Sequence, residues 1–304
     1  NVGTYRVMVH DRNHVAVDWV PGKHGAIHWD KYTKAGQPCP VAIVIGCDPL
    51  GYLISGIEVP FGLCEYNYIG AILGEPVSVV HGPVTGLPVP AASEIVIEGW
   101  IQPGDVRPEG PFGESHGYMH PRQLNPFMDV TAITHRKDPL FQTVTIGGKS
   151  LGRTDTAQLT TIKTETAAWA GLVASVREPV AVYATPSSGG MYNVRVSLRQ
   201  RVPGEARNAI AAVFGSMAEA KQVFVFDDDI DVYSDEQCDW ALATRYQADR
   251  DTIQGAGFRV VPLDPSLGGQ RAGAKMRGDC GCGKQAGDRD RRQHRVSALL
   301  ARWV

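Results

Sequence analysis

Two glutamates lie five residues apart in one short segment, Arg107-Pro108-Glu109-Gly110-Pro111-Phe112-Gly113-Glu114. Its glycines and prolines disfavour a helix or a central strand, so the segment is predicted to be a stiff loop. Such a loop can hold two carboxylates at a fixed separation, which proton transfer requires and a solvated surface does not. The simpler alternative is an ordinary turn whose glutamates face water. The pair therefore indicates either acid–base chemistry or a surface turn.

Several segments carry a family resemblance. The glutamate segment and the His116-Gly117-Tyr118 that follows it resemble the signature loop of the UbiD family of decarboxylases, which use prenylated FMN. Four further regions match that family in order: Asn1-Val2-Gly3-Thr4-Tyr5-Arg6, Pro21-Gly22-Lys23-His24, Pro60-Phe61-Gly62-Leu63-Cys64-Glu65 with Tyr68–Gly74, and Asp228–Val232 with Trp240–Arg245. Because ordered matches are more specific than any single motif, the chain is identified as a member of this family.

The resemblance implies roles for three charged residues. Arg6, Glu109 and Glu114 match the family's Arg and its two Glu positions. Glu114 is expected to deliver the proton that replaces CO₂, while Arg6 and Glu109 support it and contact the cofactor or the substrate carboxylate. An Arg between two carboxylates holds one ionised, and the other is displaced toward its protonated form. From the sequence alone, Arg6 is equally well explained as a strand residue in a surface ion pair.

A second set, Asn1, His24 and Glu65, matches the metal ligands of the family. An amide, an imidazole and a carboxylate suit Mn²⁺ or Mg²⁺, with a cofactor phosphate and water completing the shell, and K⁺ is allowed as a further cation. A lone His in a turn is usually just exposed, so the order and neighbours of these residues carry the interpretation. His28, one turn after His24, is the competing position.

The cofactor is expected to contact small and polar residues near these positions. The resemblance implies prenylated FMN from a separate UbiX-type prenyltransferase, because side chains alone cannot stabilise the carbanion that CO₂ leaves behind. We find no Gly-rich dinucleotide motif or phosphate-binding loop motif in context. The predicted cofactor-binding residues are Asn1, Gly3, Thr4, Tyr5, Arg6, Lys23, His24, Ser55, Gly56 and Lys275.

Periodicity predicts an α+β fold. Residues 1–150 are predicted to be rich in strands, at Tyr5–His10, His14–Val20, Pro40–Gly46, Val77–Val80, Glu94–Ile101, Asp129–His135 and Phe141–Ile146, with helices at Gly25–Lys34 and Tyr66–Leu73. The resemblance implies that this domain is a split β-barrel that binds flavin. Residues 151–176 are predicted to hold a long connecting helix over Asp155–Val176, whose buried stripe is Ala157, Leu159, Ile162, Ala167, Trp169 and Leu172. Residues 177–304 alternate as a small α/β domain, with strands Val180–Ala184, Tyr192–Leu198 and Gln222–Phe226 and helices Glu205–Phe214 and Glu236–Thr244.

Composition narrows the class of protein. With 30 basic and 32 acidic residues in 304, the charge gives no argument for binding nucleic acid or an anionic membrane. No apolar run approaches the ~18 residues of a membrane span, and six scattered cysteines suit reduced thiols, so we expect a cytoplasmic enzyme. The tail from about residue 276 departs from the family pattern, and it favours a disordered or altered C-terminus over a metal or RNA site.

The leading hypothesis is reversible, non-oxidative decarboxylation of an aromatic, heteroaromatic or α,β-unsaturated acid. The alternatives are an FMN-binding split-barrel oxidoreductase and an inactive subunit of a multi-subunit carboxylase. The Val-Gly-Thr-Tyr between Asn1 and Arg6 favours hydroxyaryl acids, and pocket residues are expected from Gly152–Thr161. Because the family has a further N-terminal domain, the chain is interpreted as a fragment. We expect it to dimerise through residues 177–270 but to catalyse poorly, with its site in a cleft between the domains.

Overall fold

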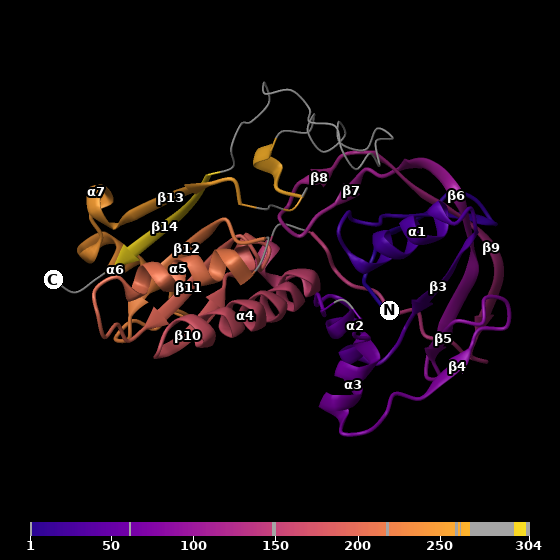
Figure 1. Ribbon diagram of the computed structural model, residues 1–304, viewed down its shortest axis with the longest axis horizontal. Helices are drawn as coiled ribbons and strands as arrows, with labels where there is room; N and C mark the ends of the chain where they lie inside the picture. Colours follow the sequence, from indigo (N-terminus) through magenta and orange to yellow (C-terminus); the bar gives the residue numbers. More distant parts are fainter. Residues whose placement is uncertain are drawn as a thin grey trace. The chain divides into compact units, whose positions relative to one another are not determined.

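The computed structural model describes residues 2–60, 62–147, 150–216, 219–258, 261, 263–267 and 295–301. The chain divides into two compact units (Figure 1). The first unit comprises Asn1–Phe112 and His120–Thr143, and the second comprises Gly113–Met119 and Val144–Val304. The short segment that holds Glu114 therefore groups with the second unit, whereas the strands on either side of it belong to the first.

An antiparallel five-stranded sheet organises the first unit. Its order is β1-β2-β9-β6-β3, formed by β1 (Val7–Val9), β2 (His14–Val17), β9 (Gln123–His135), β6 (Ile95–Glu109) and β3 (Cys39–Ile45). Apolar side chains of β2, β3, β6 and β9 form its core together with Trp19 and side chains of α1 (His24–Lys34). Among the described residues β1 and β3 end this sheet without pairing to each other, so the strand order here is open rather than a closed barrel.

The two longest strands extend well beyond the predicted ones. Figure 1 shows β6 and β9 running side by side, and their register continues to the pair Glu109↔Gln123. A register shift between Ile101 and Val106 takes in Gly104, whose φ of +73° suits glycine, so the chain passes Pro103 without ending the strand. Glu109 is consequently the last residue of a strand and not a loop residue, which corrects the prediction for the Arg107–Glu109 part of the segment.

Smaller elements complete the first unit: α2 (Pro49–Ser55), α3 (Glu65–Leu73), β4 (Val79–His81) and β5 (Pro88–Pro90). α2 was not predicted from the sequence, although Asp48 caps it by accepting a hydrogen bond from the Leu50 amide (2.8 Å) and Pro49 is its first residue. Two short strands, β7 (Phe112–Gly113) and β8 (Met119–His120), form a separate ladder in the connection between β6 and β9.

The predicted strand Phe141–Ile146 is absent from the structure, where residues 141–146 form no strand or helix. Part of its backbone is instead bound by the start of the next helix. The Thr145 amide donates to Asp155 Oδ2 (2.8 Å), and the Thr156 amide donates to the Thr145 carbonyl (3.2 Å). Because these groups are already satisfied, a strand partner is not required here.

The second unit contains a mixed sheet of order β10-β11-β12-β14-β13. The strands of this sheet are β10 (Pro179–Ala184), β11 (Asn193–Leu198), β12 (Gln222–Asp227), β13 (Thr252–Ala256) and β14 (Arg295–Ala301). The helices of the second unit are α4 (Asp155–Ser175), α5 (Glu205–Ser216), α6 (Asp235–Arg245) and α7 (Ala248–Asp251). Three short 3₁₀ turns are described as well: η1 (Leu151–Arg153), η2 (Pro186–Ser188) and η3 (Pro265–Leu267). β14 pairs with β12 and β13, which corrects the disordered alternative, but not the altered one, of the predicted C-terminus for these residues. Residues 276–294 of that tail lie outside the described residues.

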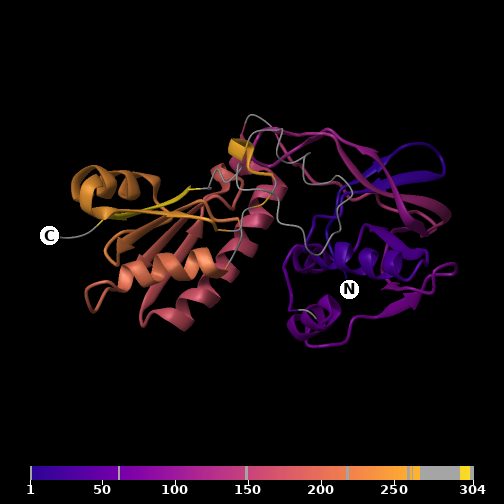
Figure 2. The same cartoon turned by 45° about the horizontal axis from the view of Figure 1, so that its top comes forward.

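Both faces of this sheet are covered by helices. Alternate residues of the central strands point to opposite faces, so Val194, Val196, Val223 and Val225 pack with α4 and α5, while Phe224 and Phe226 pack with α6. Figure 2 shows α4 and α5 on one side of the sheet and α6 on the other. This packing explains why β12 is a nearly continuous run of apolar residues, whereas β11 alternates valines with the polar residues Arg195 and Ser197.

The long helix α4 forms where it was predicted, but it buries a different face. Its buried residues are Ala157, Thr161, Thr164, Ala168 and Leu172. Ile162 and Trp169 from the predicted stripe are exposed, and only Ala157 and Leu172 of that stripe are buried. Small side chains on the buried face let α4 lie close to β10 and α5, a constraint that hydrophobicity alone does not reveal. Within the described residues no helix has both the length and the apolar character needed to cross a membrane.

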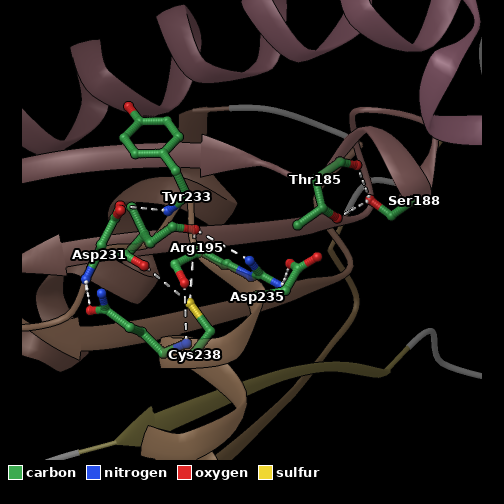
Figure 3. Close-up of polar contacts among 10 residues, drawn as sticks. Thr185, Ser188, Arg195, Asp231, Tyr233, Asp235 and Cys238 are labelled. Atoms are coloured by element: carbon green, nitrogen blue, oxygen red, sulfur yellow. Dashed lines mark hydrogen bonds and ion pairs between the residues drawn. The ribbon is translucent and has the colours of Figure 1, made fainter.

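The Asp228–Val232 motif has a structural role in the second unit. Arg245 holds Asp229 through two hydrogen bonds of 2.8 and 2.6 Å, a paired geometry that favours Arg over Lys. In Figure 3, Arg195 reaches from β11 to the Val232 carbonyl (3.2 Å) and to Asp235 (2.8 Å), next to the Asp231–Tyr233 turn. These contacts fasten the turn after β12 to the sheet.

Candidate active site

A buried polar network lies at one end of the sheet in the first unit. Arg6 precedes β1 and Asp18 follows β2, and the antiparallel pairing of these strands brings the two residues together. The Arg6 guanidinium donates to Asp18 Oδ2 (2.7 Å), and the Asp18 amide donates to the Arg6 carbonyl (3.0 Å). Asn125 in β9 donates from its side-chain amide to Asp18 Oδ1 (3.3 Å) and to Glu109 Oε2. Four side chains that lie far apart in the sequence thus form one connected group.

Glu109 is the most deeply buried member of this network, at 1% exposure. Its pKa is raised from 4.5 to about 7, and burial is the largest cause. The charge of Asp18 also raises this pKa, whereas the hydrogen bond from Asn125 and the charge of Arg6 lower it. Its Oε1 atom is buried and has no hydrogen-bond partner among the described residues. Glu109 can therefore exchange a proton near neutral pH.

Arg6 was expected to lie between two glutamates. It forms an ion pair with Asp18, a residue that was not predicted for the site, and its charge also lowers the pKa of Glu109. Arg6 also lies over the ring of Phe112, 5.9 Å from its centroid. The sequence signal for Asp18 was an acidic residue directly after the apolar strand His14–Val17. Asn125 carried no comparable signal, because β9 was predicted to begin only at Asp129.

Two further polar residues of the first unit flank the network. His120 and Gln123 are buried and hydrogen-bond to each other, with 2.7 Å between the Gln123 amide nitrogen and His120 Nε2. Burial lowers the pKa of His120, Asp18 raises it and Arg6 lowers it. This histidine is held in its neutral form more strongly than a solvated one.

Glu114 lies in a tight turn of the second unit. Its amide donates to the Tyr118 carbonyl (3.0 Å), and its carbonyl accepts from the Gly117 amide (2.9 Å). Gly117 has a φ of +83°, which a side chain would strain. Glu114 is only 4% exposed. Both glutamates of the segment are thus buried, and neither is the water-facing residue of an ordinary turn.

The turn that carries Glu114 packs against the β10–β11 hairpin. The His116 ring lies 6.0 Å from the Tyr192 ring, centroid to centroid. Burial, together with the negative charges of Asp264, Glu114 and Glu219, raises the pKa of Tyr192. A Cβ on Gly189 would come within 3.4 Å of Ser115 Oγ. The hairpin therefore packs against the two residues that directly follow Glu114.

His24 and Glu65 lie together in the first unit. Each begins a helix, α1 and α3 respectively, and His24 Nδ1 is 3.3 Å from Glu65 Oε1. The other oxygen of Glu65, a residue that is 2% exposed, accepts from the Val2 amide (2.7 Å). Asn1, the third predicted ligand, lies outside the described residues. Within the described residues no group of three or more His, Cys, Asp and Glu side chains could hold a metal ion, so a site here needs Asn1 or non-protein ligands.

Most predicted cofactor-binding residues gather around this pair. The Thr4 amide donates to the Ser55 carbonyl (3.1 Å), and their hydroxyl groups also hydrogen-bond. The Tyr5 hydroxyl accepts from the Gly25 amide (2.9 Å), next to Lys23 and His24. Gly3 packs directly on the Tyr5 ring, where a Cβ would come within 2.5 Å. Gly56 ends α2, beside Ser55. Lys275 lies outside the described residues.

Comparison with known proteins decides the family. The 3-octaprenyl-4-hydroxybenzoate carboxy-lyase Rift-related domain matches residues 1–150, and the C-terminal domain of the same carboxy-lyase matches residues 159–280. The chain belongs to the UbiD family. An uncharacterized protein of Archaeoglobus fulgidus is 31% identical over 270 residues, which make up 88% of this chain and 54% of that protein.

Solved UbiD-class structures have the same fold. HmfF from Pelotomaculum thermopropionicum, in complex with FMN, is 31% identical with a TM-score of 0.84 over 99% of this chain and 61% of its own. The vanillic acid decarboxylase of Sedimentibacter hydroxybenzoicus in its closed form is 29% identical with a TM-score of 0.81 over 98% of this chain and 58% of its own. The UbiD chain described here thus spans little more than half the length of these relatives.

Proposed function

We propose that this UbiD-family chain carries the catalytic residues of a reversible, non-oxidative decarboxylase that acts on an aromatic, heteroaromatic or α,β-unsaturated acid with prenylated FMN. The burial of both Glu109 and Glu114 carries the proposal. Hydride transfer, the reaction of the alternative FMN oxidoreductase, has no use for two buried acids. The retention of Arg6, Glu109 and Glu114 likewise argues against an inactive subunit. HmfF structures with FMN and with prenylated FMN support the cofactor.

The residues present suit such a cofactor. Gly3 and the Thr4–Ser55 pair offer close backbone approach and hydroxyl groups, and Glu109 Oε1 is a buried polar atom without a partner among the described residues. His24 and Glu65, with Asn1, would hold Mn²⁺ or Mg²⁺ against the cofactor phosphate, with K⁺ as a further cation. Lys23 and Lys275 would add positive charge near that phosphate. When bound, prenylated FMN supplies the electron sink for cleavage of the carbon–carboxylate bond.

The protein's own part is proton transfer and orientation. Glu114, as the neutral acid, donates its proton to the carbon that has lost CO₂, and the glutamate left ionised regains a proton from solvent. Arg6 and Glu109 orient the reactants. The positive charge of Arg6 attracts the substrate carboxylate, and Glu109 contributes its exchangeable proton. In the direction of carboxylation, the same glutamate removes the proton.

Co-expression with a UbiX-type prenyltransferase tests the proposal. Mass spectrometry of the released flavin should show prenylated FMN, and CO₂ should be released from at least one acid in a panel of hydroxybenzoates, furoates and cinnamates. Unmodified FMN that is reduced by a nicotinamide nucleotide, without CO₂ release from any acid, would favour the oxidoreductase. We further propose that the protein assembles as a homodimer or a higher homo-oligomer, as an evolved dimeric form of HmfF does.

A further inference from the structure

The side-chain amide of Asn125 bridges two buried carboxylates in the first unit. Its nitrogen donates to Asp18 Oδ1 (3.3 Å) and to Glu109 Oε2. Asp18 is 5% exposed and Asn125 is 3% exposed, so neither exchanges these contacts for water easily. A primary amide has two N–H donors, and both are used here, one for each acid. The proposed catalytic roles leave these contacts unexplained.

These contacts make the two oxygens of Glu109 unequal. Oε2 accepts a hydrogen bond from Asn125, whereas Oε1 is buried and accepts no side-chain hydrogen bond among the described residues; the Met8 amide also acts on this carboxylate and lowers its pKa. In a neutral carboxyl group the carbonyl oxygen accepts an N–H bond better than the hydroxyl oxygen, because the hydroxyl oxygen has given one of its lone pairs to the proton. The proton of neutral Glu109 therefore belongs on Oε1.

Asp18 determines the charge around Glu109. It accepts from Arg6 at 2.7 Å, and its negative charge raises the pKa of Glu109, whereas the positive charge of Arg6 lowers it. The polar and charged side chains near Glu109 come from four strands or their ends. Arg6 precedes β1, Asp18 follows β2, His120 lies in β8 and Asn125 lies in β9. Without Asp18, Arg6 would be left to hold Glu109 ionised.

We propose that Asp18 and Asn125 are positioning residues that set, in opposite directions, where and how tightly Glu109 holds its proton. Asp18 pairs with Arg6 and favours the neutral acid, whereas Asn125 occupies Oε2, which favours the ionised form and leaves Oε1 as the site of the proton when Glu109 is neutral. The use of that proton in catalysis rests on the proposed function, but the protonation state of Glu109 does not. The inference can therefore be tested on the protein without cofactor.

The test is a ¹³C NMR titration of the chain labelled at the glutamate side-chain carboxyl carbon, with the Glu109 signal assigned by its loss in Glu109→Gln. Asp18→Asn should lower the titration midpoint of Glu109 by about one pH unit or more, because a nearby negative charge that opposes Arg6 is removed. Asn125→Leu should raise the midpoint, because the donor that stabilises the ionised form is lost. Asp129→Asn, at an exposed carboxylate of β9 that pairs with His14, is the matched control and should leave the midpoint unchanged.

Shifts in opposite directions support the inference, and unchanged midpoints in both variants overturn it. If Asp18→Asn does not fold, the upward shift in Asn125→Leu decides alone. In the cofactor-loaded enzyme, the pH dependence of kcat/KM should move in the same directions as the NMR midpoints. Shifted midpoints in a protein that releases no CO₂ would refute the proposed function and leave this inference standing. Unshifted midpoints in an enzyme that does release CO₂ would refute this inference and leave the proposed function standing.

Discussion

At the scale of single residues, Glu109 makes the stability of the protein depend on pH. Its pKa is about 7 in the folded chain, against a reference value of 4.5. Between these two values the unfolded chain has released the proton while the folded chain still binds it. The free energy of unfolding therefore falls as the pH rises through this window.

Glu109→Gln should remove this dependence, because glutamine stays neutral at every pH. Relative to wild type, the variant should gain up to about 3 kcal/mol in the free energy of unfolding between pH 4.5 and pH 7.5. Urea denaturation at several pH values measures this difference. A difference between the two proteins that does not vary with pH would show that Glu109 ionises normally in the folded state.

The pair His24 and Glu65 leads to a prediction about metal content. Glu65→Gln should lose bound Mn²⁺ or Mg²⁺ and much of the cofactor affinity, because a neutral amide cannot replace the buried carboxylate as an anionic ligand. Elemental analysis of the purified protein measures the loss. His28→Ala, at the competing histidine one turn along α1, should retain the metal. Full metal content in Glu65→Gln would refute the ligand set.

The sequence predicted some of these residues and missed others for identifiable reasons. Glu109 and Glu114 stand in a motif of fixed spacing, so they could be recognised without a structure. Asp18 and Asn125 join the network only through the pairing of β1 with β2 and of β6 with β9. Such long-range pairing is not encoded in local spacing, and a lone Asp or Asn in a sequence is far more often a turn or surface residue.

At the scale of elements, the hairpin between β10 and β11 depends on Gly190. Its φ is +72°, and a Cβ there would lie 2.3 Å from the Ala157 carbonyl oxygen of α4. Gly204 has a similarly positive φ of +93° but no heavy atom within 4 Å of the same position. A side chain at either glycine would strain the backbone, but only a side chain at Gly190 would also overlap with α4. Comparing substitutions at the two positions therefore distinguishes the cost of strain from the cost of overlap.

Gly190→Ala should destabilise the second unit by about 1–3 kcal/mol more than Gly204→Ala, because only the first adds a clash with backbone. The difference should appear in the free energy of unfolding from urea denaturation followed by circular dichroism. Equal losses in the two variants would mean that the hairpin does not pack on α4 as described.

Elements were predicted well where their own periodicity defines them. α4, α5, α6 and the strands β10 to β12 fall within a few residues of the predicted ranges. The prediction failed where tertiary contacts override local signals. β6 and β9 continue past prolines because a bulge and a paired partner support them, and residues 141–146 form no strand because Asp155 and Thr156 bind Thr145. The face that α4 buries is set by its neighbours and not by its own largest apolar side chains.

At the scale of the whole molecule, two family domains follow one another along the chain, and each unit contributes one buried glutamate from the same short segment. Glu109 belongs to the first unit and Glu114 to the second. The proposed decarboxylase needs both: one acid to orient the reactants and the other to deliver the proton.

The most direct test is decarboxylation in D₂O by the chain loaded with prenylated FMN, comparing wild type with Glu114→Gln. Wild type should place deuterium on the carbon that carried the carboxylate. Glu114→Gln should keep the cofactor but turn over ~10²–10⁴-fold more slowly, because it lacks the proton donor. Glu178→Gln, at an exposed ion pair of the second unit, should match wild type. If loaded Glu114→Gln retains more than about half of the wild-type rate, far outside the range for a general acid, then Glu114 is not the proton donor.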